Sequence, residues 1–165
     1  MDENGYMCYH MDVGGDCTLD NKIASGTFKY QIDSKGRVRI PAKLKDALGK
    51  DLLIGYGAGE YLVIYSQEMI RNLNEKYSSI EVYAGDQYDS VREMTENLFS
   101  FECDAQDRYQ IPLALRESVG LKEGEIYFIG VFNKVEIWSE ENWNAYFNDV
   151  NFEDLADALE FLQDD

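Results

Sequence analysis

The chain has 165 residues, 45% hydrophobic and 28% charged, which is enough for one domain with a hydrophobic core. Its formal net charge of −17 argues against indiscriminate binding to nucleic acid, whose phosphates carry the same sign. The longest apolar run, residues 126–132, is far too short to cross a bilayer, so we expect no membrane partner. The first ten residues, MDENGYMCYH, lack the apolar segment of a signal peptide, and we therefore expect a cytoplasmic protein.

Residues 1–22 form an acidic N-terminal extension, with five Asp or Glu and no Lys or Arg among the first twenty. The three cysteines, Cys8, Cys17 and Cys103, are widely spaced and do not suggest a disulfide framework. Cys8, His10 and Cys17 supply three possible metal ligands. Incidental thiols in a tail are the better interpretation, because structural zinc sites usually need four ligands at tighter spacing. We therefore assign no metal and no cofactor, and the sequence leaves metal binding by these three residues open.

The stretch FKYQIDSKGRVRIPAKLKDALG, residues 28–49, predicts two strands joined by a tight turn and followed by a helix. Apolar and polar residues alternate in FKYQI and again in RVRI, which is the period of a strand with one buried face. Asp33 can accept hydrogen bonds from the backbone that follows it, and Gly36 can adopt a positive φ, so DSKG is typical of a turn. Pro41 fits the first position of the helix, and Gly49 ends it.

Basic residues gather around this turn. Residues 29–45 contain six Lys or Arg and one acidic residue, a local charge of +5 in a chain of −17. The alternation of RVRI turns both of its arginines away from the core. The sequence therefore permits a focused contact with an anion, although an exposed charged turn is also an ordinary surface feature. The basic residues at the turn and just past it are Lys35, Arg37, Arg39 and Lys43.

A hairpin and two helices are predicted next. LLIGY and YLVIY predict two strands joined around residues 57–60. Ser66 is placed to cap a helix over residues 67–77. We expect a loop near residues 78–88 and then a helix over about residues 89–97.

The chain contains an internal repeat at an offset of 71 residues. Residues 28–49 align without a gap with FSFECDAQDRYQIPLALRESVG, residues 99–120, so the Asp-x-x-x-Arg spacing of the first turn recurs as Asp104 and Arg108. Each copy is too small to bury much surface alone. The repeat therefore suggests a pseudo-twofold unit whose halves interlock around one core.

The second copy is followed by the same elements as the first. EIYFIGV and KVEIW predict a hairpin, and Ser139 is placed to cap the helix after it. The residues beyond predict an acidic helix with an apolar stripe, which packs in a core or against a subunit more often than it binds a ligand. The apolar residues of this stripe are Phe152, Leu155, Leu159 and Leu162.

The shared core is predicted from the inward positions of both copies. Cys103 falls on one of these positions, and we expect it to be an inert packing residue. The side chains expected to be buried are Ile32, Val38, Ile40, Leu44, Cys103, Ile111 and Leu115.

DSKGRVRIP, followed by a Leu-bearing helix and repeated as DAQDRYQIP, resembles the swapped-hairpin barrel of the AbrB class. The tandem arrangement and LKEGEIYFIGVFNKVEIWSEENW resemble the MraZ family, the transcriptional repressors of the division and cell-wall gene cluster. Gly26 and Arg92 stand where that family often has Gly and Arg. The resemblance implies an α+β, mainly β fold, in which two tandem half-barrels form one pseudo-twofold double-barrel unit with flanking helices. The expected divisions are an extension over 1–22, repeats over 23–77 and 98–147, a linker with a helix over 78–97, and an acidic C-terminal helix over 148–165.

The resemblance also implies a function. It implies a ring-type homo-oligomer that binds double-stranded DNA at tandem promoter repeats, as a nucleoid-associated repressor with no small-molecule substrate. The DNA-binding residues implied are Lys35, Arg37, Arg39, Lys43 and Arg108. The structural residues of the two motifs are Asp33, Gly36 and Asp104.

The second motif departs from the first at two positions of its turn. Gln106 stands where the first motif has Lys35, and Asp107 stands where it has Gly36. Asp tolerates a left-handed backbone better than most residues, so we expect the turn to survive. The charge of Asp107 beside Arg108 opposes a phosphate, which indicates a mainly structural second motif. A ring-forming interaction protein that has lost strong DNA binding is therefore the alternative function.

An enzyme is the least favoured class. His10 is the single histidine, and the sequence contains no P-loop, G-x-S-x-G, H-E-x-x-H or paired C-x-x-C motif. Asp33 and Asp104 are better explained as turn residues than as a pair of catalytic carboxylates. We therefore assign no catalytic residues.

Overall fold

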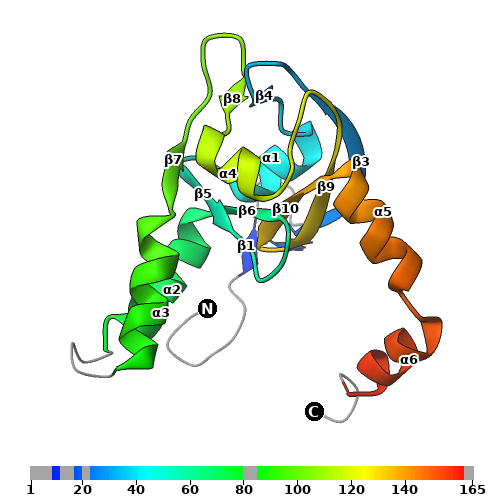
Figure 1. Cartoon of the computed structure of the whole chain (residues 1–165). Helices are drawn as coiled ribbons and strands as arrows, with labels where there is room; N and C mark the ends of the chain where they lie inside the picture. The colour runs from blue at the N-terminus through cyan, green and yellow to red at the C-terminus, as the bar shows by residue number, and fades with distance from the viewer. Residues whose placement is uncertain (1–8, 12–16, 20–22, 80–84, 162–165) are drawn as a thin grey trace.

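The computed structural model describes residues 9–11, 17–19, 23–79 and 85–161 (Figure 1). The strands are β1 (Tyr9–Met11), β2 (Cys17–Leu19), β3 (Ala24–Ile32), β4 (Arg37–Val38), β5 (Leu52–Tyr56), β6 (Leu62–Tyr65), β7 (Phe99–Phe101), β8 (Tyr109–Gln110), β9 (Gly124–Phe132) and β10 (Lys134–Ser139). The helices are α1 (Ala42–Leu48), α2 (Gln67–Tyr77), α3 (Asp86–Glu96), α4 (Leu113–Ser118), α5 (Glu140–Asp149) and α6 (Phe152–Phe161).

The two repeats interlock by exchanging their first strands. The main sheet is antiparallel and has the order β3-β9-β10-β6-β5-β7. Strand β3 of the first repeat pairs with the hairpin of the second, and β7 of the second repeat pairs with the hairpin of the first. The hairpins themselves meet at β6 and β10, where Ile64 lies opposite Val135. Each repeat therefore completes the sheet of the other, as the repeat in the sequence predicts.

The remaining strands form two small sheets, β1 with β2 and β4 with β8. The α+β class is confirmed, with antiparallel pairing in every sheet of the described residues. Over the same residues, strand pairing does not close the six-stranded sheet into a barrel.

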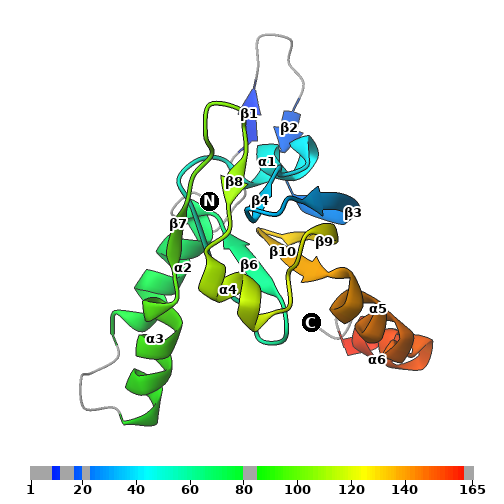
Figure 2. The same ribbon diagram turned by 45° about the horizontal axis from the view of Figure 1, so that its top comes forward.

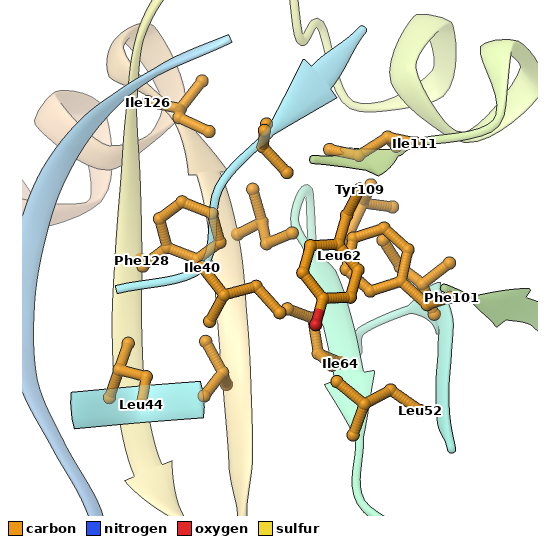
Figure 3. Close-up of a cluster of buried hydrophobic side chains, with 14 of the residues drawn as sticks. Ile40, Leu44, Leu52, Leu62, Ile64, Phe101, Tyr109, Ile111, Ile126 and Phe128 are labelled. Carbon is orange, nitrogen blue, oxygen red and sulfur yellow. The ribbon is translucent and has the colours of Figure 1, made fainter. Parts of the chain in front are cut away.

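Both repeats fill one hydrophobic core (Figure 3). Leu44 of α1 and Leu115 of α4 stand at equivalent positions, and both are fully buried. Strand residues of both hairpins surround them, so neither repeat holds a separate core. The predicted core residues confirmed as buried are Ile32, Val38, Ile40, Leu44, Ile111 and Leu115.

Cys103 is the exception, because its side chain is exposed and the prediction of an inert core residue is wrong. Strand β3 runs on to the buried Ile32, whereas β7 ends at Phe101. Beyond β7, Cys103 makes a single bridge to Tyr109. The ring of Tyr109 fills the core in its place, with its centroid 4.9 Å from that of Phe101. A large aromatic residue therefore leaves the thiol at the surface.

The helix caps agree with the sequence. Ser66 Oγ accepts the N–H of Met69 at 3.2 Å, and Ser139 Oγ accepts the N–H of Asn142 at 3.1 Å, so both predicted caps are confirmed. Pro41 precedes α1 as its N-cap instead of being its first helical residue. Helix α3 begins three residues earlier than predicted.

The helix pairs leave one end of the molecule open. Helices α2 and α3 lie on one side and α5 and α6 on the other, both away from the small β4–β8 sheet (Figures 1 and 2). Helices α1 and α4 lie between that small sheet and the main sheet (Figure 1). The two Asp-x-x-x-Arg turns, which flank β4 and β8, are therefore uncovered by the longer helices.

Leu115→Ala is expected to lower the free energy of unfolding by about 2–5 kcal/mol, because it removes a fully buried side chain and leaves a cavity. Leu113→Ala is the matched control in the same helix, since Leu113 is 59% exposed, and it should change stability by no more than about 0.5 kcal/mol. Urea unfolding at one fixed protein concentration measures both. Equal losses for the two variants would contradict the assigned core.

Candidate nucleic-acid interface

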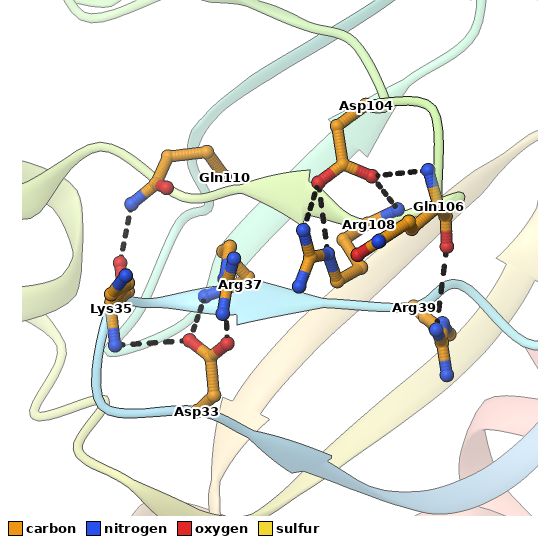
Figure 4. A network of polar contacts seen from close by, with 8 residues as sticks. All are labelled: Asp33, Lys35, Arg37, Arg39, Asp104, Gln106, Arg108 and Gln110. Atoms are coloured by element: carbon orange, nitrogen blue, oxygen red, sulfur yellow. Dashed lines mark hydrogen bonds and ion pairs between the residues drawn. The ribbon is translucent and has the colours of Figure 1, made fainter.

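The first turn, residues 33–37, is organised by the carboxylate of Asp33 (Figure 4). Its Oδ1 accepts the backbone N–H groups of Lys35 at 3.0 Å and Arg37 at 2.8 Å. Its Oδ2 accepts the Nε–H of Arg37 at 2.6 Å. Gly36 has a φ of 78°, and its N–H donates to the carbonyl of Asp33 at 2.9 Å. One side chain therefore fixes both the backbone of the turn and the direction of its arginine.

The second turn, residues 104–108, repeats this geometry. Oδ1 of Asp104 accepts the N–H groups of Gln106 at 2.8 Å and Arg108 at 3.0 Å, and Oδ2 accepts the Nε–H of Arg108 at 2.8 Å. Asp107 has a φ of 60° at the position of Gly36. The prediction that this turn survives its Asp is confirmed.

These bonds lower the pKa of both aspartates. For Asp33 the main cause is the hydrogen bond from the backbone N–H of Arg37. Burial raises the pKa and opposes this effect in part, and the bond from the Arg37 side chain lowers the pKa further. For Asp104 the side-chain and backbone bonds from Arg108 lower the pKa to about 2. Both carboxylates are therefore ionised at neutral pH, and each arginine is half of an oriented ion pair.

The two turns are joined across the repeats. Strands β4 and β8 pair, with Arg37 opposite Gln110, and the N–H of Ile111 donates to the carbonyl of Gly36 at 2.9 Å. Gln110 and Arg39, at equivalent positions, make reciprocal contacts: the Gln110 amide donates to the carbonyl of Lys35, and Arg39 Nη2 lies 3.4 Å from the carbonyl of Gln106 (Figure 4). The two turns are therefore connected by hydrogen bonds in both directions.

Three of the predicted DNA-binding residues share one open groove of about 590 Å³, here called the arginine groove. Arg37 and Arg39 reach it from the first repeat and Arg108 reaches it from the second. The side chains of Arg37 and Arg108 are 25% and 28% exposed, so they are held against the protein and still reach solvent. The full lining is Lys29, Tyr30, Gln31, Ile32, Asp33, Arg37, Val38, Arg39, Arg108 and Glu123.

The other two predicted DNA-binding residues lie outside the arginine groove. Lys35 stands at the tip of the first turn, and Lys43 lies exposed on α1. Lys29 and Lys45 were not predicted from the sequence as residues of the site. Lys29 points outward from β3 into the groove and pairs with Glu125, and Lys45 of α1 pairs with Asp107 across the repeats. The place of Lys29 on the outward face of a predicted strand could have indicated that it belongs to the site. The contact of Lys45 with Asp107 could not be predicted in this way, because it depends on the interlocked fold.

The groove is suited to holding an anion. Guanidinium groups donate in a planar fork that matches phosphate and carboxylate oxygens, and the bond from Arg37 to Asp33 uses only one of its five donors. Among the described residues there is no group of three or more His, Cys, Asp or Glu placed to hold a metal ion. The possible set of Cys8, His10 and Cys17 lies outside the side chains that the structure describes. No helix in the described ranges has the length and apolar character needed to cross a membrane.

The exchanged strands and paired Asp-x-x-x-Arg turns define a tandem-repeat protein with a basic groove where its repeats meet. The family model described as MraZ protein matches the chain twice, over residues 23–92 and 94–165. The chain therefore belongs to the MraZ protein family, and the resemblance to that family seen in the sequence is confirmed.

Similar proteins carry the same family name. A protein named Transcriptional regulator MraZ from Thermoanaerobacter sp. (strain X514) is 37% identical over 139 residues, covering 83% of this chain and 96% of that protein. Proteins of the same name from Caldanaerobacter subterraneus subsp. tengcongensis and Finegoldia magna are 37% and 36% identical, covering 82% and 81% of this chain and 95% and 94% of their own lengths.

The carboxyl group of Asp104 is expected to titrate at about pH 2, below its ordinary value of 3.8, because Arg108 stabilises the ionised form. Since the folded pKa is the lower one, the contribution of the pair to stability is full above pH 3.8 and is lost as the pH falls through 2. Carbon-detected NMR of the side-chain carboxyl measures the titration. Arg108→Ala should raise the Asp104 pKa, and an unchanged value in that variant would contradict the assigned cause.

Proposed function

We propose that this protein is a sequence-specific DNA-binding transcriptional regulator, and that the arginine groove is where it meets DNA. The observation that carries the proposal is the convergence of Arg37, Arg39 and Arg108, from both repeats, in one open groove at the uncovered end of the molecule. The similar proteins are named transcriptional regulators and not enzymes, which supports the same class for this chain.

The charge distribution suits a focused contact with DNA. The chain as a whole carries −17 and repels a polyanion, whereas the groove lining holds four basic residues against two acidic ones. Each phosphate neutralised by Lys or Arg releases counterions, which makes binding depend steeply on salt. One groove reaches only a few phosphates, so a single chain binds weakly at physiological salt.

Several copies are therefore needed, and we propose a ring-type homo-oligomer. When one subunit is bound, the grooves of its neighbours meet the same DNA at a high effective concentration. Tandem short repeats in a promoter would present the matching sites. On the family resemblance we propose a nucleoid-associated repressor of a division and cell-wall gene cluster, built from AbrB-like swapped-hairpin halves over residues 23–77 and 98–147.

A ring-forming interaction protein without strong DNA binding is the second candidate. Asp107, next to Arg108, is the observation that favours it. The ion pair between Asp107 and Lys45 reduces the weight of this observation, because the carboxylate is already matched by a cation. A DNA-shift assay at low and moderate salt, on the promoter of its own gene, separates the two candidates.

Arg37→Ala is expected to abolish binding to promoter DNA, Lys35→Ala to weaken it strongly, and Arg108→Ala to weaken it less. The first turn supplies Lys35, Arg37 and Arg39, whereas the second supplies Arg108 alone. Each lost phosphate contact should reduce the slope of log affinity against log salt by about 0.9 per site. Fluorescence anisotropy across a salt series measures both the affinity and the slope.

Arg71→Ala is the matched control, because it removes the same charge from the exposed face of α2, on the side away from the β4–β8 sheet (Figure 1). This control and the turn variants should keep the assembly mass of the wild type. Wild-type binding by Arg37→Ala, or a greater loss in Arg108→Ala, would defeat the proposal.

The native protein is expected to sediment as an oligomer with a single mass. The prediction rests on the apolar stripe of the acidic C-terminal helix, which needs a surface to cover it. Sedimentation velocity at micromolar concentration, followed by native mass spectrometry, gives the number of subunits. A monomer under these conditions would rule out binding by a ring.

A further inference from the structure

Two basic residues at equivalent positions lie against the turns of the opposite repeats. Lys45 on α1 and Arg116 on α4 are 71 residues apart, the offset of the repeat itself. Each meets the residue at the tip of the other repeat's turn: Lys45 meets Asp107, and Arg116 meets Gly36. Neither residue was predicted from the sequence to belong to the site.

Lys45 is the counter-ion of Asp107. Its ammonium group pairs with Oδ1 of Asp107 and lies 5.9 Å from the ring centroid of Tyr109. The side chains of Lys45 and Asp107 are 37% and 50% exposed, so water still screens the pair in part. The bond to Asp107 is also the main cause of a raised pKa at Lys45, because it stabilises the charged ammonium form.

Arg116 supports the first turn by contact instead of by charge. Its guanidinium group lies directly against Gly36, where an added methyl group would come within 3 Å of it. Its Nε–H donates to the carbonyl of Ile111 at 3.0 Å, and the N–H of Ile111 donates to the carbonyl of Gly36 at 2.9 Å. The positive φ of Gly36 favours glycine at this tip, and a side chain there would also have to displace the guanidinium group of Arg116.

The charges of the second turn explain why Lys45 matters. Asp104 and Asp107 oppose the single cation Arg108, which leaves that turn with a charge of −1 when Lys45 is not counted. With Lys45 the sum is zero. An anion that approaches Arg108 therefore meets a neutral turn instead of an unpaired carboxylate on the adjacent residue.

We propose that Lys45 and Arg116 are positioning residues of the arginine groove: each holds the turn of the other repeat, and Lys45 also neutralises Asp107 so that Arg108 can face an anion. The part that concerns DNA rests on the function proposed above. Neither residue needs to touch DNA, which separates this role from that of Arg37.

A double-mutant cycle on Lys45 and Asp107 tests the proposal. Lys45→Ala should weaken DNA binding about twofold to fivefold per site, because it leaves Asp107 unpaired. Asp107→Gly, which introduces the residue type of the first turn, should bind DNA as well as the wild type or better. The double variant should return to the affinity of Asp107→Gly with the salt slope of the wild type. If Lys45 were itself a phosphate contact, the double variant would stay weak and lose about 0.9 in slope per site, and the proposal would be overturned.

Two further variants sharpen the cycle. Lys45→Arg should keep the wild-type affinity, because the second repeat carries Arg at the equivalent position and the charge is retained. Lys50→Ala removes the same charge from an exposed position just beyond α1, and it should leave both DNA binding and stability close to wild type. A loss in Lys50→Ala as large as that in Lys45→Ala would show that only total charge matters and would overturn the proposal.

The free protein supplies a readout that does not depend on DNA. In the same cycle, Lys45 and Asp107 should be coupled by a factor of about 1.5 to 5 in the unfolding equilibrium constant. The amide of Asp107, which donates to the carbonyl of Asp104, should exchange faster with solvent in Lys45→Ala. Absence of both effects overturns the positioning role. Coupling in a protein that fails to bind DNA would keep the positioning role and instead defeat the proposed function.

Discussion

The carboxylate at the start of each turn is the interaction on which the groove depends. In each turn, residues 33–37 and 104–108, the chain must reverse direction while β4 still pairs with β8, which leaves turn N–H groups without ladder partners. Asp33 and Asp104 accept those groups and also the Nε–H of the following arginine. The same bonds therefore stabilise the reversal and aim the guanidinium. A longer or neutral side chain cannot do both, because the geometry requires two oxygens close to the backbone.

The exchange of strands makes this local geometry part of the whole fold. Strand β3 leads into the first turn but pairs with β9 of the second repeat, and β7 leads into the second turn but pairs with β5 of the first. The strand that leads into each turn thus pairs with a strand of the other repeat, and the two turns meet where β4 pairs with β8. A groove shared by Arg37 and Arg108 follows directly from this topology. Neither repeat alone contains it.

Local structure was predictable from the sequence where it depends only on residues nearby in the chain. The alternation around Val38 and Ile40, the positive φ at Gly36 and the serine caps depend on neighbours within a few residues, and all were predicted. Tyr30 and Cys103 share the same alternation, yet Tyr30 is 36% exposed and Cys103 lies at the surface. Burial at Tyr30 depends on β9 of the other repeat, which lies alongside it, whereas Cys103 is exposed because β7 ends at Phe101 and Tyr109 of the same repeat packs in the core. The Lys45–Asp107 pair was unpredictable because it too joins the two repeats.

The two turns share one geometry and differ in charge. Counting Asp33, Lys35, Arg37 and Arg39, the first turn carries +2, while the second is neutral only through a lysine of the first repeat. The first turn thus has the net positive charge that attracts an anion and also holds its arginine in a fixed direction. The second turn only holds its arginine in a fixed direction. In the proposed complex with DNA, that difference favours an approach of the polyanion from the side of the first turn, because the chain as a whole carries −17. The departure of the second motif from the first therefore leaves a site with a defined polarity, which two identical turns related by a twofold axis would lack.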